Sequence, residues 1–181
     1  MSANRFTTAL GRSLARALLP LLAVIPAACS PDRPARSQQV PDGGEGLPGR
    51  IVSVTDGDTV VIDFGSGEDE RVRLIGIDTP ETVKPNSPVE CWGPEASARA
   101  EELLPEGTTV LAQRDEEVRD RYGRLLLYLW RADDGLFINH QMLAEGHAET
   151  LSIAPNTSRR SEFSAAAARA REEGLGLWGA C

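Results

Sequence analysis

Three short runs rich in β-branched residues, separated by tight-turn signals, most restrict what this 181-residue chain can fold into. The runs cover residues 50–54, 59–64 and 71–77. Asp56-Gly57, a pair typical of β-hairpin turns, separates the first two runs, and a Gly-Ser-Gly turn separates the second from the third. In the third run, Arg71 and Arg73 alternate with apolar residues, so both arginines lie on one face of a strand. The pattern predicts three consecutive antiparallel strands.

The remainder of the chain alternates between helix and strand patterns. Pro94 suits the first position of a helix, Asn139 is placed to cap a second, and Gly174 is suited to end a third. The predicted helices cover residues 94–104, 139–146 and 158–173, and two further strands cover residues 109–113 and 125–131. Five strands interleaved with three helices predict an α+β fold, a small closed β-barrel with the helices packed outside it.

The N-terminal residues have the pattern of an export signal. Residues 1–28 contain three arginines, no acidic residue and an apolar stretch too short to span a bilayer. They predict a bacterial-type secretory signal peptide. Its end resembles the lipobox of bacterial lipoproteins, in which Cys29 is lipidated, although Pro26 departs from that pattern and leaves ordinary cleavage open. Either outcome places the mature protein outside the cytoplasm, anchored to a membrane or secreted.

Composition changes again after the signal. Residues 29–48 are rich in Pro, Gly and Ser, which predicts a flexible tether, and the folded domain is expected to comprise residues 49–181. Removing the three signal arginines lowers the formal net charge from −8 to −11. An acidic surface repels nucleic acid at long range, which argues against a protein that coats DNA non-specifically. It leaves room for a nuclease whose site becomes cationic when metal binds.

Two cysteines, Cys91 and Cys181, lie in the expected domain. Export to an oxidising compartment makes them a natural disulfide pair. The bridge would join the loop before the first helix to the last residue, and closing so long a loop contributes on the order of 4 kcal/mol in the chain-entropy description. Two unpaired thiols are the alternative, because the geometry of the fold decides whether the sulfur atoms meet.

Three acidic side chains stand at predicted strand ends. Asp58 begins the second strand, while Asp78 and Glu81 follow the third. Taken singly, Asp58 belongs to an ordinary hairpin turn, and Asp78 to an ordinary capped turn. Together these turns offer carboxylate and carbonyl oxygens, the ligands that a hard cation such as Ca²⁺ prefers. The sequence therefore predicts a calcium site at these strand ends.

Arginines accompany the carboxylates. Arg73 lies in the third strand, and Arg124 follows the turn residue Gly123 just before an apolar strand. A guanidinium grips two phosphate oxygens at once, which a lysine does not. Arg119 and Arg121 also have the pattern of a solvated, charged loop. Carboxylates that hold a metal and a water, combined with arginines that neutralise charge on phosphorus, are what cleavage of a phosphodiester requires.

Four motifs follow one another at compatible spacings within residues 49–178. They are Asp56-Gly57-Asp58-Thr59, Arg73 with Asp78-Thr79-Pro80-Glu81-Thr82, Gly93-Pro94-Glu95-Ala96-Ser97, and Tyr122-Gly123-Arg124. Each motif is modest alone, but the four in this order are highly specific. The chain thereby resembles the staphylococcal nuclease (thermonuclease) family over nearly all of its folded part. The resemblance implies a five-stranded OB-fold β-barrel with three packed helices, and a calcium-dependent phosphodiesterase acting on DNA and RNA.

The resemblance also implies roles for individual residues. The calcium ligands would be the side chains of Asp58 and Asp78 and the carbonyl of Thr79. The catalytic residues would be Glu81, as general base, and Arg73 and Arg124, which stabilise the transition state. The residues touching a terminal phosphate of the nucleotide would be Arg121 and Tyr122.

Two segments depart from the family pattern. Leu151 and Ile153 occupy positions where the family has tyrosines that line the base site. Because stacking on an aromatic ring contributes about 1–3 kcal/mol per base, weaker base binding is expected. The loop 83–91 contains one basic residue, Lys84, and is less basic than in the type member. These departures affect substrate affinity and leave the predicted chemistry intact.

The leading hypothesis is an exported nuclease that acts as a monomer, prefers single-stranded DNA and RNA, and leaves 3′-phosphate ends. A non-catalytic OB-fold module that binds nucleic acid or a peptide is the alternative, although the full set of carboxylates and arginines favours the enzyme. A structural lipoprotein of the envelope is a third possibility, and it does not explain the acidic and arginine residues.

Overall fold

The structure is a computed structural model that describes residues 38–40, 45–82 and 88–181. The chain divides into two units, residues 1–32 and 33–181, and every described residue belongs to the second. The predicted signal peptide, Cys29 and much of the predicted tether therefore lie outside the described residues, as does Lys84. Within the described residues, no helix is long and apolar enough to cross a bilayer.

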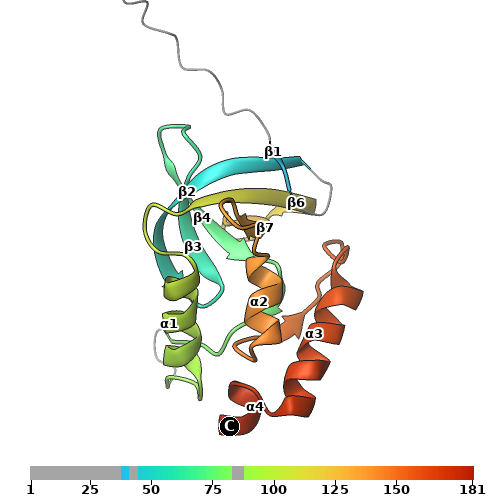
Figure 1. Ribbon diagram of the computed structural model, residues 1–181. Helices are drawn as coiled ribbons and strands as arrows, with labels where there is room; N and C mark the ends of the chain where they lie inside the picture. Colours follow the sequence, from blue (N-terminus) through green and yellow to red (C-terminus); the bar gives the residue numbers. More distant parts are fainter. Residues whose placement is uncertain (1–37, 41–44, 83–87) are drawn as a thin grey trace, which may run out of the picture. The chain divides into compact units, whose positions relative to one another are not determined.

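Five strands close into a barrel (Figure 1). They follow the order β2-β3-β4-β7-β6, and β6 pairs back with β2. Their bounds are β2 (Glu45–Asp56), β3 (Thr59–Asp63), β4 (Asp69–Leu74), β6 (Thr109–Arg119) and β7 (Leu125–Arg131). Neighbouring strands are antiparallel except β4 and β7, which run parallel. The predicted α+β barrel is confirmed.

Strand β2 closes the barrel because it is long enough to pair on both sides. Residues 47–50 pair with β6, and residues from Arg50 onward pair with β3. Two register shifts in the β2–β3 ladder, between Ile51 and Ser53 and again before Asp56, allow the bend that this closure requires. Regular structure begins earlier than expected, because β2 starts at Glu45, and β1 (Gln38–Gln39) pairs with it.

The third predicted strand is divided into β4 and β5 (Gly76–Asp78). Gly76 has φ +83°, and a Cβ there would lie 2.4 Å from the ring of Phe163, so the break requires glycine. The detached β5 pairs with β8 (Glu149–Leu151), a strand that the sequence pattern did not predict. The expected charged loop after residue 113 is also regular, since β6 continues to Arg119.

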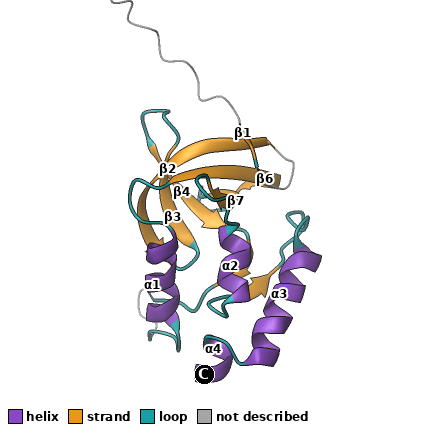
Figure 2. Ribbon diagram, in the orientation of Figure 1, coloured by secondary structure: helices purple, strands orange, loops and turns teal. Residues whose placement is uncertain are grey.

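The three predicted helices are present and lie beside the barrel (Figure 2), with a short fourth helix at the C-terminus. They are α1 (Gly93–Leu103), α2 (Ile138–Ala144), α3 (Arg160–Glu173) and α4 (Leu177–Ala180). Gly174 ends α3 in the left-handed conformation, as expected. Aliphatic side chains of the strands form the core together with Ala96, Ala100 and Phe163 from the helices.

Asn139 does not cap a helix, so that prediction was wrong. It lies inside α2 and is fully buried. Its Nδ2 donates to the carbonyl of Ile75 at 2.9 Å, and its Oδ1 accepts from the N–H of Leu129 at 3.0 Å. The side chain thus satisfies backbone groups left unpaired where β4 ends, and it ties α2 to the barrel.

The predicted disulfide is confirmed. Cys91 and Cys181 are bonded, with their Cα atoms 6.0 Å apart. The bridge joins the residue two before α1 to the last residue of the chain, which follows α4 (Figure 1). Both cysteines are exposed.

Candidate functional site

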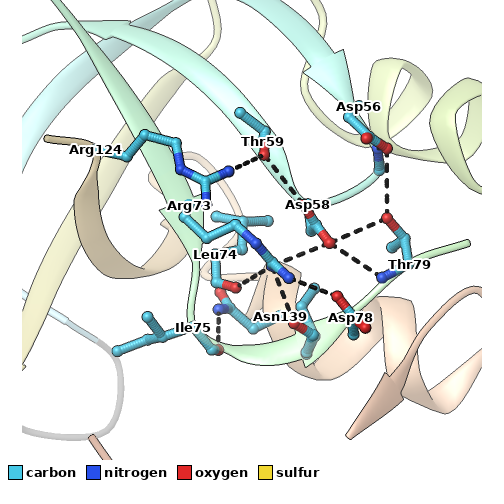
Figure 3. A network of polar contacts seen from close by, with 12 residues as sticks. Asp56, Asp58, Thr59, Arg73, Leu74, Ile75, Asp78, Thr79, Arg124 and Asn139 are labelled. Atoms are coloured by element: carbon cyan, nitrogen blue, oxygen red, sulfur yellow. Dashed lines mark hydrogen bonds and ion pairs between the residues drawn. The ribbon is translucent and has the colours of Figure 1, made fainter. Parts of the chain in front are cut away.

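Strand register brings five of the predicted site residues close together, namely Asp58, Arg73, Asp78, Thr79 and Arg124 (Figure 3). Arg73 on β4 lies opposite Thr59 on β3, directly after the turn that carries Asp58. The parallel pairing of Val72 with Leu125 sets the first residues of β7, and with them Arg124, beside β4. Residues from three separate stretches of sequence therefore meet because β3, β4 and β7 are neighbours in the barrel.

Arg73 links two of the predicted calcium ligands. Its Nη1 lies 3.0 Å from Oδ2 of Asp58, and its Nη2 lies 2.7 Å from Oδ1 of Asp78. Nη1 also donates to the carbonyls of Leu74 and Ile77, each at 2.9 Å. Because Arg73 and Asp58 are both largely buried, these charged hydrogen bonds are poorly screened and fix the guanidinium firmly.

Thr79 supports Asp58 from the other side. Its backbone N–H donates to Oδ2 of Asp58 at 3.0 Å, and its hydroxyl lies 3.2 Å from the same oxygen. Thr79 is buried and packs tightly on the hairpin, since a Cβ on Gly57 would lie 2.8 Å from its side chain. The glycine of the hairpin motif is therefore needed for this close approach.

Asp56 is a site residue that the sequence analysis treated only as a turn residue. It is buried, and its Oδ1 accepts from the N–H of Gly57 and lies 3.5 Å from the Thr79 hydroxyl. Burial, followed by the nearby Asp58 carboxylate, raises the pKa of Asp56 to about 6. A side-chain hydrogen bond with Glu81 acts in the same direction. Glu81 is therefore linked through Asp56 to the carboxylate cluster, which comprises Asp56, Asp58 and Glu81.

Arg124 joins the site through Thr59. Its Nη1 lies 3.4 Å from the Thr59 hydroxyl, which in turn lies 3.1 Å from Oδ1 of Asp58. Its Nε donates to Oδ2 of Asp120 at 2.7 Å. Burial opposes ionisation of Asp120, but hydrogen bonds from the side chain and backbone of Arg124 outweigh it and leave the pKa of Asp120 below its ordinary value. Asp120 thus holds Arg124 in place, a role that no local sequence pattern indicates.

Arg121 and Tyr122 lie farther out. Nη2 of Arg121 donates to the Tyr122 hydroxyl at 2.6 Å, and the guanidinium lies 4.7 Å from the centre of the ring. Tyr122 is 68% exposed. Both residues line a pocket of about 520 Å³ that extends from Arg73 and Arg124 to Leu151 and Ile153. Leu151 and Ile153, at the positions that depart from the family pattern, therefore form part of the apolar wall of that pocket.

The Glu81 backbone is fixed by Glu90. The N–H of Glu81 donates to Oε2 of Glu90 at 3.0 Å, and the N–H of Glu90 donates to the carbonyl of Glu81 at 3.0 Å. The Glu81 carboxylate accepts from the N–H of Thr82 at 3.1 Å. The two glutamates thus clamp the ends of the loop between them, an arrangement without a local sequence pattern.

The donor set near Arg73 suits a hard cation. The Arg73 guanidinium touches both Asp58 and Asp78, so the space between the two carboxylates already accepts a positively charged group. Among the described residues, no three Asp, Glu, His or Cys side chains form a ready-made metal group. A calcium ion at these carboxylates would complete its shell with backbone carbonyls and water, as this cation does elsewhere.

The fold and the site together define a class of protein. A closed five-stranded barrel with helices outside is an OB-fold, and carboxylates interlocked with arginines at one end equip it for chemistry on phosphate esters. The profile of the family described as staphylococcal nuclease homologue matches residues 71–180. The chain belongs to the staphylococcal nuclease family.

Individual relatives agree with this assignment. The thermonuclease of Staphylococcus intermedius is 42% identical over 128 residues, which is 71% of this chain and 74% of the relative. The thermonuclease of Staphylococcus hyicus is 35% identical over 129 residues, with the same coverage of each chain. Endonuclease YncB of Bacillus subtilis is 36% identical over 135 residues, or 71% of this chain and 63% of the relative.

Proposed function

We propose that this protein is an exported, Ca²⁺-dependent nuclease that hydrolyses phosphodiester bonds of DNA and RNA and prefers single strands. Its family and its thermonuclease and endonuclease relatives make it a hydrolase of phosphodiesters. The observation that carries the finer proposal is the contact of one guanidinium, that of Arg73, with both Asp58 and Asp78. A single phosphodiester group could therefore contact the Arg73 guanidinium and a metal ion held by Asp58 and Asp78.

The two arginines would contact the phosphate in different ways. Arg73 is anchored by four oxygen atoms, so its position is set before substrate arrives. Arg124 forms an ion pair with Asp120, and its side chain lines the pocket. Fixed donors aimed at the place where negative charge develops are worth about 3–4 kcal/mol each in transition-state stabilisation.

Asp58 and Asp78 would hold the calcium ion, with the Thr79 carbonyl as a third ligand. When bound, the ion supplies positive charge at the phosphate and holds a water near it. Glu81 would take the proton of the attacking water, a role that needs an ionised carboxylate close to the carboxylate cluster. Asp56 shares a hydrogen bond with Glu81 and restrains its orientation.

The pocket wall gives the nucleotide an unusual surface. Tyr122 offers an exposed ring, while Leu151 and Ile153, 38% and 61% exposed, offer aliphatic groups opposite the arginines. A base resting on Leu151 and Ile153 gains apolar contact without ring stacking, so we propose weak affinity and little base preference. Arg121 and Tyr122 would contact the terminal phosphate.

Digestion of denatured DNA tests the enzyme directly. Purified protein without residues 1–29 is incubated with single-stranded DNA in Ca²⁺ or in EDTA, and fragments are followed on a gel. We expect degradation with Ca²⁺ alone, and fragments that a phosphatase active on 3′ ends makes extendable by a polymerase. If Glu81→Gln and Arg124→Ala both degrade DNA as fast as the parent, the assignment fails. Retardation of intact DNA in EDTA would instead favour the non-catalytic binding module.

Export and anchoring need a separate test. We propose that Cys29 carries a lipid after signal cleavage, so that the enzyme works at a membrane surface outside the cytoplasm as a monomer. In a bacterial host, the wild-type chain should partition into the detergent phase and Cys29→Ala should not. Partition of both into the aqueous phase would mean ordinary secretion.

A further inference from the structure

The C-terminus of the chain is connected to the loop that carries Glu81. Glu81 and Glu90 exchange two hydrogen bonds, each 3.0 Å long. Glu90 is followed by Cys91, whose sulfur is bonded to Cys181. Cys181 is therefore one disulfide and one peptide bond away from Glu90, the residue that fixes the backbone of Glu81.

Tight packing transmits the position of this segment to Glu81. A Cβ on Gly93 would lie 3.1 Å from the carbonyl oxygen of Glu81 and 2.8 Å from the side chain of Thr82. The Thr82 hydroxyl also lies 3.3 Å from that of Ser97 on α1. Because interiors packed this closely have little slack, a shift of the segment preceding α1 moves the backbone of Glu81 with it.

The C-terminal end of the bridge is itself held. The N–H of Cys181 donates to the carbonyl of Leu177 at 3.0 Å, and the N–H of Leu177 donates to the carbonyl of Gly146 at 2.9 Å. The guanidinium of Arg171 on α3 lies 4.0 Å from the centre of the Trp178 ring. The bridge thus anchors the start of α1 to a fixed part of the fold, while both cysteines stay exposed to solvent.

We propose that the Cys91–Cys181 disulfide positions Glu81 through Glu90, and that full nuclease activity requires the oxidised bridge. The proposal rests on the role proposed above for Glu81. Reduction by an external dithiol transfers two electrons and two protons to the bridge, giving two cysteine thiols and a cyclic disulfide of the reagent. The Glu90 segment then loses its covalent anchor, and Glu81 loses its fixed position.

The effect should be local, because a second contact keeps α1 in place. Nε1 of Trp92 donates to Nδ1 of His147 at 3.1 Å, and the two rings are stacked. This contact does not depend on the bridge, so it continues to tie Trp92 to His147 after reduction. Misplacement of a catalytic group lowers turnover more than substrate binding, since the arginines and the pocket are unaffected.

A double-mutant cycle tests the proposal on the mature protein at saturating Ca²⁺. The four proteins are the parent, Cys91→Ala/Cys181→Ala, Glu81→Gln, and the triple variant. We expect bridge loss to lower kcat about tenfold with KM within about twofold, as suits a misplaced catalytic group. In the Glu81→Gln background, bridge loss should have no further effect on kcat. An equal loss in both backgrounds, or an unchanged kcat in the parent background, would overturn the proposal.

Variants in which the disulfide stays intact distinguish a loss of Glu81 positioning from a loss of folding. Glu90→Ala removes the acceptor of the Glu81 N–H and should reproduce the tenfold loss, whereas Glu90→Gln retains an acceptor oxygen and should restore activity. Full activity of Glu90→Ala would overturn the proposal even if the bridgeless protein did not fold. Ala166→Gly in α3 lowers stability away from this loop and should leave kcat unchanged. A fully active Glu81→Gln parent would instead contradict the proposed role of Glu81 itself.

Discussion

Two parts of the site are built differently. The chemical end is the part around Arg73 and Asp58, and the recognition end is the part around Tyr122, Leu151 and Ile153. The side chains of Arg73 and Asp58 are largely buried, and each has several polar partners. The side chains of Tyr122, Leu151 and Ile153 are exposed and line the pocket. The first arrangement fixes atoms before substrate binds, while the second leaves them free to adapt. Changes at the chemical end should therefore lower turnover steeply, and changes at the recognition end should mainly alter affinity.

The largest effect is expected from Arg73→Lys. Lysine keeps the charge, but a single ammonium does not span Asp58 and Asp78 while also bonding two carbonyls. We expect kcat to fall about 10³-fold, within the range for losing a fixed transition-state donor. Arg71→Lys is the matched control, because Arg71 lies on the same strand and face but is exposed. A mild loss, equal in both variants, would mean that the tight network contributes little to catalysis.

A smaller effect is expected where one residue acts through another. Asp120→Ala removes the charged partner of Arg124 and the acceptor of two backbone N–H groups. We expect kcat to fall about 100-fold, as for loss of a residue that orients a catalytic group. Asp134→Ala breaks a comparable ion pair with Arg131 away from the site and should leave kcat unchanged. Equal activity of the two variants would show that Arg124 needs no such support.

The carboxylate cluster should also make stability depend on pH. The pKa of Asp56 is raised in the folded protein, so its stabilising contribution is complete below about pH 4 and is lost as pH rises through about 6. Asp56→Asn keeps the Oδ1 acceptor and removes the charge. In EDTA at pH 8 we expect its free energy of unfolding to exceed that of the parent by about 2 kcal/mol.

Urea unfolding at several pH values measures this difference. The advantage of Asp56→Asn should shrink towards zero near pH 4, where the parent carboxyl is protonated in both states. An advantage that is independent of pH would contradict the assigned cause. Asp63→Asn, at the exposed end of β3, is the control for the loss of one negative charge away from the cluster.

The sequence was informative where function depends on local pattern. The predicted strands end near Asp58, Arg73 and Asp78. Because those strands were predicted correctly, the proximity of the three residues could be predicted too. The barrel itself followed from alternation and turn residues in the same way. Arg124 was also predicted, because its turn and the following apolar strand are local features.

The sequence was silent or misleading where a residue acts across the fold. Asp120 and Glu90 are ordinary loop acids until tertiary structure sets them against Arg124 and Glu81. Asn139 has the local features of a helix cap, yet unpaired carbonyls of the barrel compete for its amide. Strand β8 is too short and exposed to leave a pattern, and it exists because Gly76 detaches β5 to pair with it.

The smallest effect is expected at the recognition end. Leu151→Tyr restores an aromatic ring on the pocket wall, and stacking of a base on it should add about 1 kcal/mol of binding, the low end for such contacts at an exposed site. We expect KM for single-stranded DNA to fall about fivefold with kcat unchanged, and base preference to sharpen. Leu175→Tyr is the matched control, because Leu175 is also 38% exposed but lies between α3 and α4, outside the pocket. A change in kcat instead of KM would mean that this wall positions the scissile phosphate, and the division between the two ends would no longer hold.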